Sequence, residues 1–378
     1  MTAWQYVYID VVETAQICGL DIRQSTLLRT DEVQARCPYC QDYKYRMYLS
    51  RDPANPTWFC HNCSTSGNAV TLYADWNPSG RRLTTKQAFY ELLNNPQIHS
   101  VTSTYEFQQW PEPTIKPLKE RSKIYFSLLE MLTLEHRHFS NLLARGLSPE
   151  VIHGNFYRSF PTEERMRQHI TDKLASKFDL SNMPGFYTKD FKWKMAGTRS
   201  GILTPVCDKD NLIQGLQIRL DEPPPKIITL KDGTKKVKKG ERFRWLSTGA
   251  SYYENGTGIK SFIHVVGDIH SDVLHLTEGV IKPDVASYLS GGELFVGLTG
   301  VQNLRYLPRV LDALHPRKIV ECIDMDLRTN LNVQKAQSKI QAICMPRCQE
   351  YEQFYWPTDK KGIDDYLLFE KLKAQQTA

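Results

Sequence analysis

The stretch RCPYCQDYKYRMYLSRDPANPTWFCHNC, residues 36–63, carries two Cys-x2-Cys pairs. The first pair is Cys37 and Cys40 and the second is Cys60 and Cys63, with nineteen residues between the pairs. Each pair can direct two thiolates at one tetrahedral ion, and the residues between them are enough for a small antiparallel sheet. Four thiolates leave no open coordination position, so the pattern predicts a structural zinc ion. We therefore expect a zinc ribbon within residues 1–95.

Aromatic and basic side chains surround these cysteines. Rings interleaved with cations can stack on unpaired bases while the cations neutralise phosphates. Tyr39 and Trp58 are our candidates for such contacts. The alternative is that the rings fill the core of a small domain that has little else to bury. The residues concerned are Tyr39, Tyr43, Lys44, Tyr45, Arg46, Tyr48, Arg51, Trp58 and Phe59.

The composition is that of a soluble globular protein of two or three domains. The chain has 378 residues, of which 41% are hydrophobic and 24% charged. We find no apolar run of about 18 residues and no secretory signal pattern, so we expect no membrane partner. The five cysteines outside the two pairs are scattered, as in reduced proteins of the cytoplasm.

The formal net charge of +6 permits a nucleic-acid partner. Residues 226–244 hold eight Lys or Arg and two Asp or Glu, and their pattern predicts a β-hairpin turning at Asp232-Gly233. The hairpin either binds phosphates or is a solvated loop.

Further along the chain, the patterns predict three more segments. Residues 96–120 contain four prolines and few periodic apolar residues, which indicates a linker. Residues 121–270 begin with helices near 124–132 and 136–144 and continue as short strands. Residues 271–378 alternate strands and helices, which is typical of a parallel sheet covered by helices. The predicted strands of this last segment are 273–277, 294–298, 318–323 and 353–356, and its predicted helices are 282–289, 304–314 and 332–343.

Acidic residues follow two of these strands directly. Glu278 comes after the first strand, and Asp324 and Asp326 come after the third. The carboxyl ends of parallel strands meet at one edge of a sheet, where ligands bind. Carboxylates gathered there suit Mg²⁺ or Mn²⁺, and such ions support phosphoryl transfer. Asp364 and Asp365 are either a further metal-binding pair or favourable acids at a helix N-terminus.

These residues carry a family resemblance. Glu278-Gly279, Asp324-x-Asp326 and Asp364-Asp365 together resemble a Toprim domain. The segment LLARGLSPEVI, residues 142–152, resembles the one that opens the RNA polymerase domain of DnaG-type primases. Residues 201–219, followed by Arg244-Trp245-Leu246-Ser247, resemble strands of that domain's N-terminal subdomain.

The resemblance implies an α+β multi-domain protein: a zinc ribbon at 1–95, a linker at 96–120, a mixed α+β subdomain at 121–270 and an α/β Toprim core at 271–378. It also implies a primase, a nucleotidyltransferase that makes short RNA primers on a single-stranded DNA template from nucleoside triphosphates. The expected catalytic residues are Glu278, Asp324 and Asp326, which would hold Mg²⁺ or Mn²⁺ together with Asp364. The residues expected to contact nucleic acid or nucleotide are Arg219, Lys226, Arg244, Lys282, Tyr39 and Trp58.

The sequence departs from the pattern of cellular primases at two positions. The first ribbon pair has two cysteines where cellular primases more often have a cysteine and a histidine, which is closer to phage, plasmid and other mobile-element forms. Lys282 stands where many primases carry an acid, and Asp284 is the nearest replacement. We find no nucleotide-binding loop of the helicase kind, so a partner helicase would be a separate chain. The alternatives are a zinc-finger and Toprim recombination mediator, which only binds DNA, and a Toprim nuclease.

Overall fold

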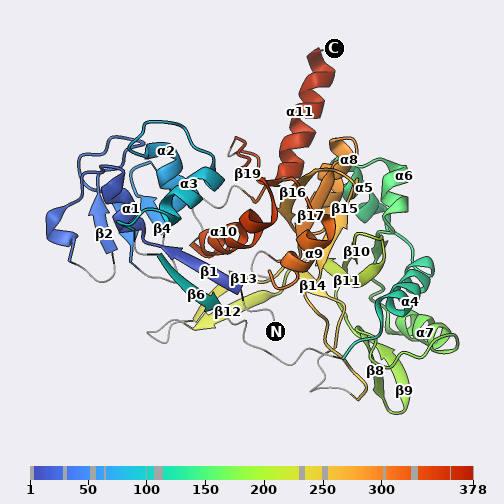
Figure 1. Ribbon diagram of the computed structural model, residues 1–378. Helices are drawn as coiled ribbons and strands as arrows, with labels where there is room; N and C mark the ends of the chain where they lie inside the picture. Colours follow the sequence, from blue (N-terminus) through green and yellow to red (C-terminus); the bar gives the residue numbers. More distant parts are fainter. Residues whose placement is uncertain are drawn as a thin grey trace. The chain divides into compact units, whose positions relative to one another are not determined.

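The computed structural model describes residues 4–28, 32–51, 57–63, 65–98, 100–105, 114–229, 235–248, 254–300, 304–324, 331–357 and 359–377 (Figure 1). The fold is mixed α+β, as predicted. The chain forms two compact units, each made of separate segments. Unit 1 comprises residues 1–109, 270–278 and 300–366, and unit 2 comprises residues 110–269, 279–299 and 367–378. None of the helices in the described ranges is long and apolar enough to cross a membrane.

The first part of unit 1 is a small antiparallel sheet with helices around it. Its strands, in spatial order, are β2 (Glu32–Ala35), β3 (Met47–Ser50), β4 (Thr57–Cys60) and β5 (Ser66–Asn68). Strands β3 and β4 lie between the two cysteine pairs, which confirms the predicted antiparallel sheet. The helices are α1 (Val11–Ile17), α2 (Ala69–Trp76) and α3 (Thr85–Leu93). Side-chain caps fix two of the helix starts: the Asp10 carboxylate accepts from the Val12 amide at 2.7 Å, and Thr84 forms a capping box with Gln87.

The segment predicted as a linker contains a strand. β6 (Ser100–Tyr105) pairs antiparallel with β1 (Trp4–Ile9) over six residue pairs. Residues 100–105 carry Val101, Thr102, Thr104 and Tyr105, which favour extended backbone. Three of the four prolines behind the linker prediction come only after this strand.

The second part of unit 1 holds three parallel strands: β16 (Val273–Glu278), β18 (Lys318–Glu321) and β19 (Glu350–Gln353). β18 lies between β16 and β19 and is parallel to both, as the alternation of strands and helices predicted. The helices are α9 (Leu307–Leu314), α10 (Leu331–Cys344) and the start of α11 (Ile363–Thr377). The prediction of the last strand at 353–356 was wrong, because Trp356 is buried beyond the strand, where its indole nitrogen donates to the Lys360 carbonyl at 2.9 Å.

Unit 2 is built on an antiparallel sheet. Its order is β14 (Phe243–Trp245), β11 (Ile213–Leu220), β10 (Gly201–Cys207) and β7 (Arg158–Ser159). Helices α4 (Leu118–Glu130) and α7 (Glu164–Ala175) contribute to its main hydrophobic core. Helices α5 (His136–Ala144) and α6 (Pro149–Gly154) contribute to a second core together with α8 (Ile281–Leu289). The Ser148 side chain caps α6, and Pro149 occupies its first turn.

Three further strand pairs complete unit 2, and all are antiparallel. β15 (Ile263–Val266) pairs with β17 (Leu294–Leu298). β8 (Phe186–Lys189) pairs with β9 (Lys192–Met195), and β12 (Pro225–Thr229) pairs with β13 (Lys235–Lys239). The last pair confirms the basic hairpin, and its predicted turn at Asp232-Gly233 lies outside the described residues.

Candidate metal centre and nucleic-acid interface

The two cysteine pairs of unit 1 converge. The sulfur atoms of Cys37 and Cys63 lie 3.7 Å apart, those of Cys40 and Cys60 lie 3.8 Å apart, and all four lie within 4.8 Å of one another. Tetrahedral zinc with Zn–S bonds of about 2.3 Å requires sulfur atoms about 3.8 Å apart. The donor set and its spacing therefore fit one zinc ion with four protein ligands.

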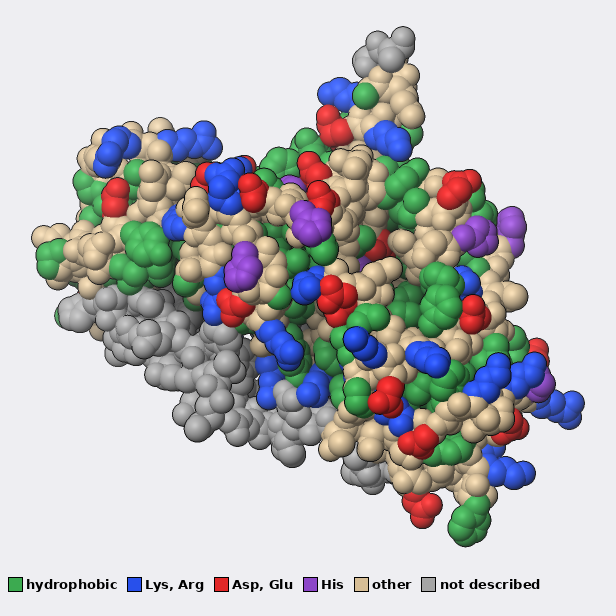
Figure 2. Space-filling view, turned by 45° about the vertical axis from the view of Figure 1, so that its right-hand side comes forward, with side chains coloured by type: hydrophobic (Ala, Val, Ile, Leu, Met, Phe, Trp, Pro, Cys, Tyr) green, Lys and Arg blue, Asp and Glu red, His purple; other side chains and the backbone are tan. Residues whose placement is uncertain are grey.

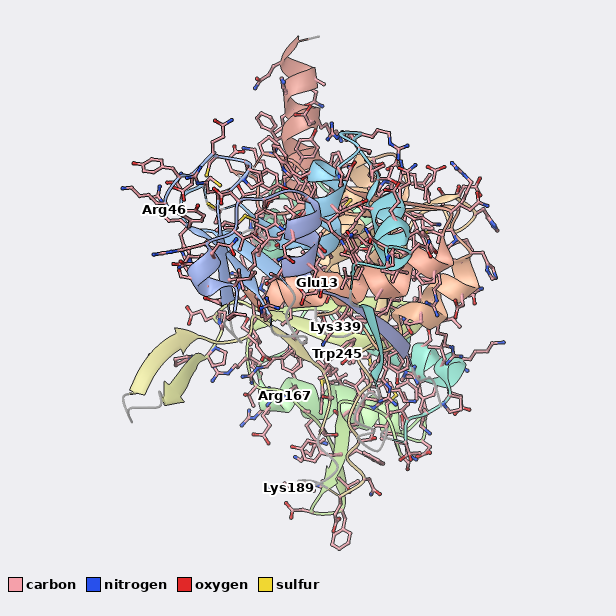
Figure 3. The ribbon with its side chains drawn as sticks, turned by 60° about the vertical axis from the view of Figure 1, so that its left-hand side comes forward. Glu13, Arg46, Arg167, Lys189, Trp245 and Lys339 are labelled. Carbon is pink, nitrogen blue, oxygen red and sulfur yellow. The ribbon has the colours of Figure 1, made fainter. Side chains whose placement is uncertain are left out.

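Neighbouring groups donate hydrogen bonds to these sulfur atoms. The Asn62 backbone amide donates to Cys60 Sγ at 3.4 Å, and its side-chain amide donates to Cys40 Sγ at 3.3 Å. Thr65 Oγ1 lies 3.0 Å from Cys63 Sγ. Such contacts orient metal ligands and stabilise negative charge on sulfur. Arg46, labelled in Figure 3, accepts through its backbone carbonyl from the His61 amide at 2.9 Å. These contacts join the two cysteine loops.

The rings of Trp58 and Tyr39 pack against each other. Their rings stack with centroids 5.2 Å apart and planes 14° apart. Trp58 is 2% exposed, and its indole nitrogen donates to the Asn68 carbonyl at 3.2 Å. Tyr39 Oη donates to Asp75 at 2.7 Å. The buried Trp58 ring belongs to the core, so the prediction that it contacts bases was wrong and the core alternative holds for this ring.

The opposite face of the ribbon sheet carries other aromatic rings. Tyr48 on β3 lies directly opposite Phe59 on β4, and both are half-buried. The exposed His61 ring meets both rings edge-on, at centroid distances of 5.0 Å and 4.8 Å. Side chains alternate along a strand, so the register that buries Trp58 turns Tyr48 and Phe59 outward. Sequence reasoning included these two rings in the group but did not select them.

The carboxylates of unit 1 lie at the ends of neighbouring parallel strands. Glu278 ends β16 and is half-buried. The register pairs Leu276 with Glu321 on β18, and the Cys322 amide donates to the Leu276 carbonyl at 2.7 Å. Glu278, the last residue of β16, and the buried Asp324, just beyond β18, therefore lie at the ends of adjacent strands at the same edge. β18 ends at Glu321, earlier than predicted, and Asp326 lies outside the described residues.

The C-terminal acids approach this edge from another segment. The Lys361 ammonium lies 3.9 Å from Asp324 Oδ2. Three residues later, the buried Asp364 lies in the first turn of α11, as the helix alternative for Asp364 and Asp365 predicted. Among the described residues, the four cysteines are the one group of three or more potential metal ligands that the structure brings close together. Hard carboxylate donors fit Mg²⁺, which often takes only one or two protein carboxylates and completes its shell with water and phosphate.

Asp284 of unit 2 has a structural environment. It is buried, its Oδ1 lies 3.0 Å from His264 Nε2, and it also accepts from the Tyr157 hydroxyl. The Cys207 amide donates to His264 Nδ1 at 3.0 Å, so the ring proton of neutral His264 points at Asp284. These buried hydrogen bonds give Asp284 a packing role and do not favour it as the replacement acid. Lys282, on the same helix, is half-buried.

Basic side chains of unit 2 gather around Arg219. Burial and the nearby charges of Arg242 and Arg145 lower the pKa of Arg219 to about 10, with the Asp221 carboxylate partly opposing them, so Arg219 stays charged at neutral pH. Arg145 belongs to the quoted RGL segment, but sequence reasoning did not select it or Arg242. A group of like charges that is partly desolvated is a favourable place for an anion.

The other predicted basic residues are placed differently. Arg244 on β14 lies opposite Ile218, whereas Arg219 lies opposite Phe243. Directly opposite residues share a face, so Arg219 and Arg244 lie on opposite faces of this sheet. Arg244 is exposed. Lys226 is part of β12, and its side chain lies outside what the structure describes.

Comparison with known proteins gives two kinds of likeness. A family model described as "Domain of unknown function (DUF3854)" matches residues 262–374. No curated protein matches the chain. Among solved structures, the zinc-binding and RNA polymerase domains of the Aquifex aeolicus primase are 13% identical, with 97% of this chain and 82% of that chain covered and a TM-score of 0.49.

Two further solved structures cover 68% of this chain. The DnaG primase catalytic domain bound to single-stranded DNA is 14% identical over 77% of its own length, with a TM-score of 0.44. A DNA primase domain from Pseudomonas aeruginosa is 13% identical over 78% of its own length, with a TM-score of 0.45. All three likenesses have low sequence identity and TM-scores below 0.5.

Proposed function

We propose that this protein is a DNA primase that joins ribonucleotides into short primers on single-stranded DNA. The observation that carries the proposal is the placement of Glu278 and Asp324 after adjacent parallel strands, in a chain that also holds a four-cysteine ribbon. Mg²⁺ or Mn²⁺ held there with Asp326 and Asp364 would supply charge stabilisation for nucleotidyl transfer. Glu278 would hold a metal ion or take the proton of the attacking 3′-hydroxyl.

The remaining residues have binding roles in this proposal. Arg219, with Arg145 and Arg242, would hold phosphates of template or nucleotide, because a partly buried positive cluster attracts them strongly. Arg244, on the opposite face of the sheet from Arg219, would add positive charge there, and Lys226 and Lys282 would add further charge for nucleic acid. In the ribbon, the outward Tyr48 and Phe59 rings offer stacking platforms to unpaired template bases, alongside Tyr39. A cytoplasmic location, a separate helicase partner and a phage or mobile-element origin belong to the same proposal.

Primer synthesis from ribonucleotides on single-stranded DNA, with Mg²⁺ or Mn²⁺, tests the proposal. Asp324→Ala combined with Asp326→Ala should abolish synthesis, with a loss on the order of a hundredfold or more, because metal-held charge stabilisation is lost. The matched control is Asp359→Ala, an exposed acid of the same unit that pairs with its neighbour Lys360.

The alternatives give different products in the same assay. Shortening of a labelled strand would identify a nuclease. DNA binding without metal-dependent turnover would favour a recombination mediator. Full synthesis by the double variant would show that the catalytic assignment is wrong.

A further inference from the structure

The β8–β9 hairpin of unit 2 ends in an unusual turn. Strand β8 stops at Lys189, β9 starts at Lys192, and only Asp190 and Phe191 lie between them. Both turn residues have left-handed backbone, with φ of 51° and 59°. Turns of this type normally take Asn-Gly or Asp-Gly, because both positions require positive φ. Phe191 instead occupies the glycine position, and it is fully exposed.

Each feature of this tip disfavours folding. A bulky residue in the left-handed region is strained, and the exposed ring gains no burial in return. Lys189 and Lys192 lie directly opposite each other, where like charges repel. Within the described part of the chain, no acid lies within salt-bridge distance of either lysine. Local rules broken together at one place indicate a function there.

One face of the hairpin packs against unit 2, and the opposite face is cationic. Trp193 packs against the main core of unit 2, and its carbonyl accepts from the Gln168 side chain on α7 at 3.1 Å. The register puts Lys189, Lys192 and Lys194 on the face away from Trp193. Lys194 lies 3.9 Å from Glu164, which is itself largely exposed.

The figures show the same arrangement. Figure 3 shows Lys189 toward the far end of the hairpin and Arg167 nearer the body of the unit. In Figure 2, one hydrophobic side chain protrudes at the lower right, and both basic and acidic side chains lie on the surface above it. The hairpin therefore has an exposed aromatic tip and a basic face.

We propose that the β8–β9 hairpin binds single-stranded nucleic acid, with the Phe191 ring stacked on an unpaired base and Lys189 and Lys192 neutralising the flanking phosphates. An aromatic ring stacks on any base, and lysines beside it add a salt-dependent attraction to the backbone. Single-stranded nucleic acid fits better than an acidic protein, because a lone protruding ring offers no groove for a side chain. It fits better than a membrane, because one ring buries little area. The contact goes beyond the proposed function, since it uses none of the cysteines or carboxylates.

Fluorescence anisotropy of the full-length protein with labelled oligo(dT) tests the ring. Phe191→Ala should weaken binding roughly five- to a hundredfold, the range for one stacked base, and Phe191→Trp should preserve it. Phe191→Gly creates the favoured Asp-Gly turn, so it should raise Tm while weakening binding as much as alanine. A purely structural role for Phe191 predicts unchanged binding in all three variants, and that result would overturn the proposal.

The salt dependence of the same binding tests the lysines. Replacing both Lys189 and Lys192 by Gln should lower the slope of log K against log salt by about 1.4, because two phosphate contacts on a single strand are lost. Replacing Lys119 and Lys123 on α4 by Gln removes the same charge from exposed positions of the same unit and should leave the slope nearly unchanged.

Three results would overturn the hairpin's assignment. The first is equal slopes for the two double variants, and the second is no oligo(dT) binding by the unaltered protein. The third is that the hairpin substitutions weaken binding to anionic phosphatidylserine vesicles and leave oligo(dT) binding unchanged. Failure of the primase proposal is a separate result. It appears as missing synthesis by the unaltered protein while hairpin-dependent oligo(dT) binding persists.

Discussion

Single cysteines decide whether the ribbon forms. Cys63 Sγ lies 3.0 Å from Thr65 Oγ1, and the other three sulfur atoms complete a set with zinc-like separations. We expect Cys63→Ser to lower the zinc content from one ion per chain to well below one, because a serine hydroxyl is a poor zinc ligand. Metal analysis of the purified protein gives the readout. Cys18→Ser, which changes a cysteine outside the cluster, should keep the full zinc content; retention of zinc by the Cys63 variant would contradict the four-cysteine site.

Two neighbouring aromatic residues of β4 should respond in opposite ways to mutation. Trp58→Ala removes a fully packed ring and should cost about 3–5 kcal/mol of stability, seen as a lower Tm. Phe59→Ala, made together with Tyr48→Ala, removes outward rings, so it should change Tm little but weaken binding to single-stranded DNA several-fold. Thermal melting and anisotropy on the same samples separate the two roles. A large Tm loss in the Tyr48 and Phe59 variant would show that these rings also belong to the core.

This contrast shows what residue identity can and cannot predict. The cysteine spacing was sufficient for the metal site, because ligand chemistry is local. The aromatic residues were all equally plausible in sequence, because a shift of one residue in register turns a strand's side chains to the other face. Only the pairing of Leu49 with Trp58 and of Tyr48 with Phe59 decides which rings face outward.

At the scale of elements, helices with clear ends were predicted best. Helix α5 has the predicted bounds of 136–144. Helix periodicity and caps are local signals. Strand β19 was misplaced, because a buried aromatic residue such as Trp356 can be covered by a loop as well as by a sheet. β15 and α7 were missed, since short or polar segments carry weak periodicity.

A buried carboxylate on β18 forms hydrogen bonds that connect β18, β19 and α10. Glu321 on β18 accepts hydrogen bonds from Tyr351 on β19, from Gln337 on α10 at 2.8 Å and from Gln353 at 3.3 Å. Burial raises the pKa of Glu321, and these three donors only partly offset it. A raised folded-state pKa contributes stability that is fully present below the unfolded value and is lost as pH rises through the folded value.

Glu321→Gln should therefore stabilise the protein increasingly as pH rises above about 4.3, the ordinary pKa of glutamate. The amide is always neutral, and each unit of upward pKa shift in the folded protein is worth about 1.4 kcal/mol. Melting temperatures of the variant and the unaltered protein, compared at about pH 5 and about pH 8, measure the effect. A difference that stays constant with pH would mean that Glu321 does not titrate differently in the folded protein. Glu130→Gln, at an exposed position on α4, is the control.

At the scale of the whole molecule, the proposed function divides between binding and chemistry. The ribbon and the basic cluster around Arg219 would bind the template, whereas Glu278 and Asp324 would serve the transfer step. The net charge of +6 is too small to identify these roles. They follow from where a few charged residues stand in the sheets, and that placement depends on pairings between strands far apart in sequence.

This division predicts two classes of loss in the full-length protein. Cys60→Ser combined with Cys63→Ser should lower synthesis started on bare single-stranded DNA by roughly tenfold or more, because the stacking platforms of the ribbon lose their support. Extension of a primer already annealed to template should fall much less, since a duplex end supplies the starting strand. Asp324→Ala combined with Asp326→Ala should abolish both reactions. Gel analysis of the two reactions side by side measures the split, and equal loss of both in the cysteine variant would place the ribbon in the chemical step and not in template binding.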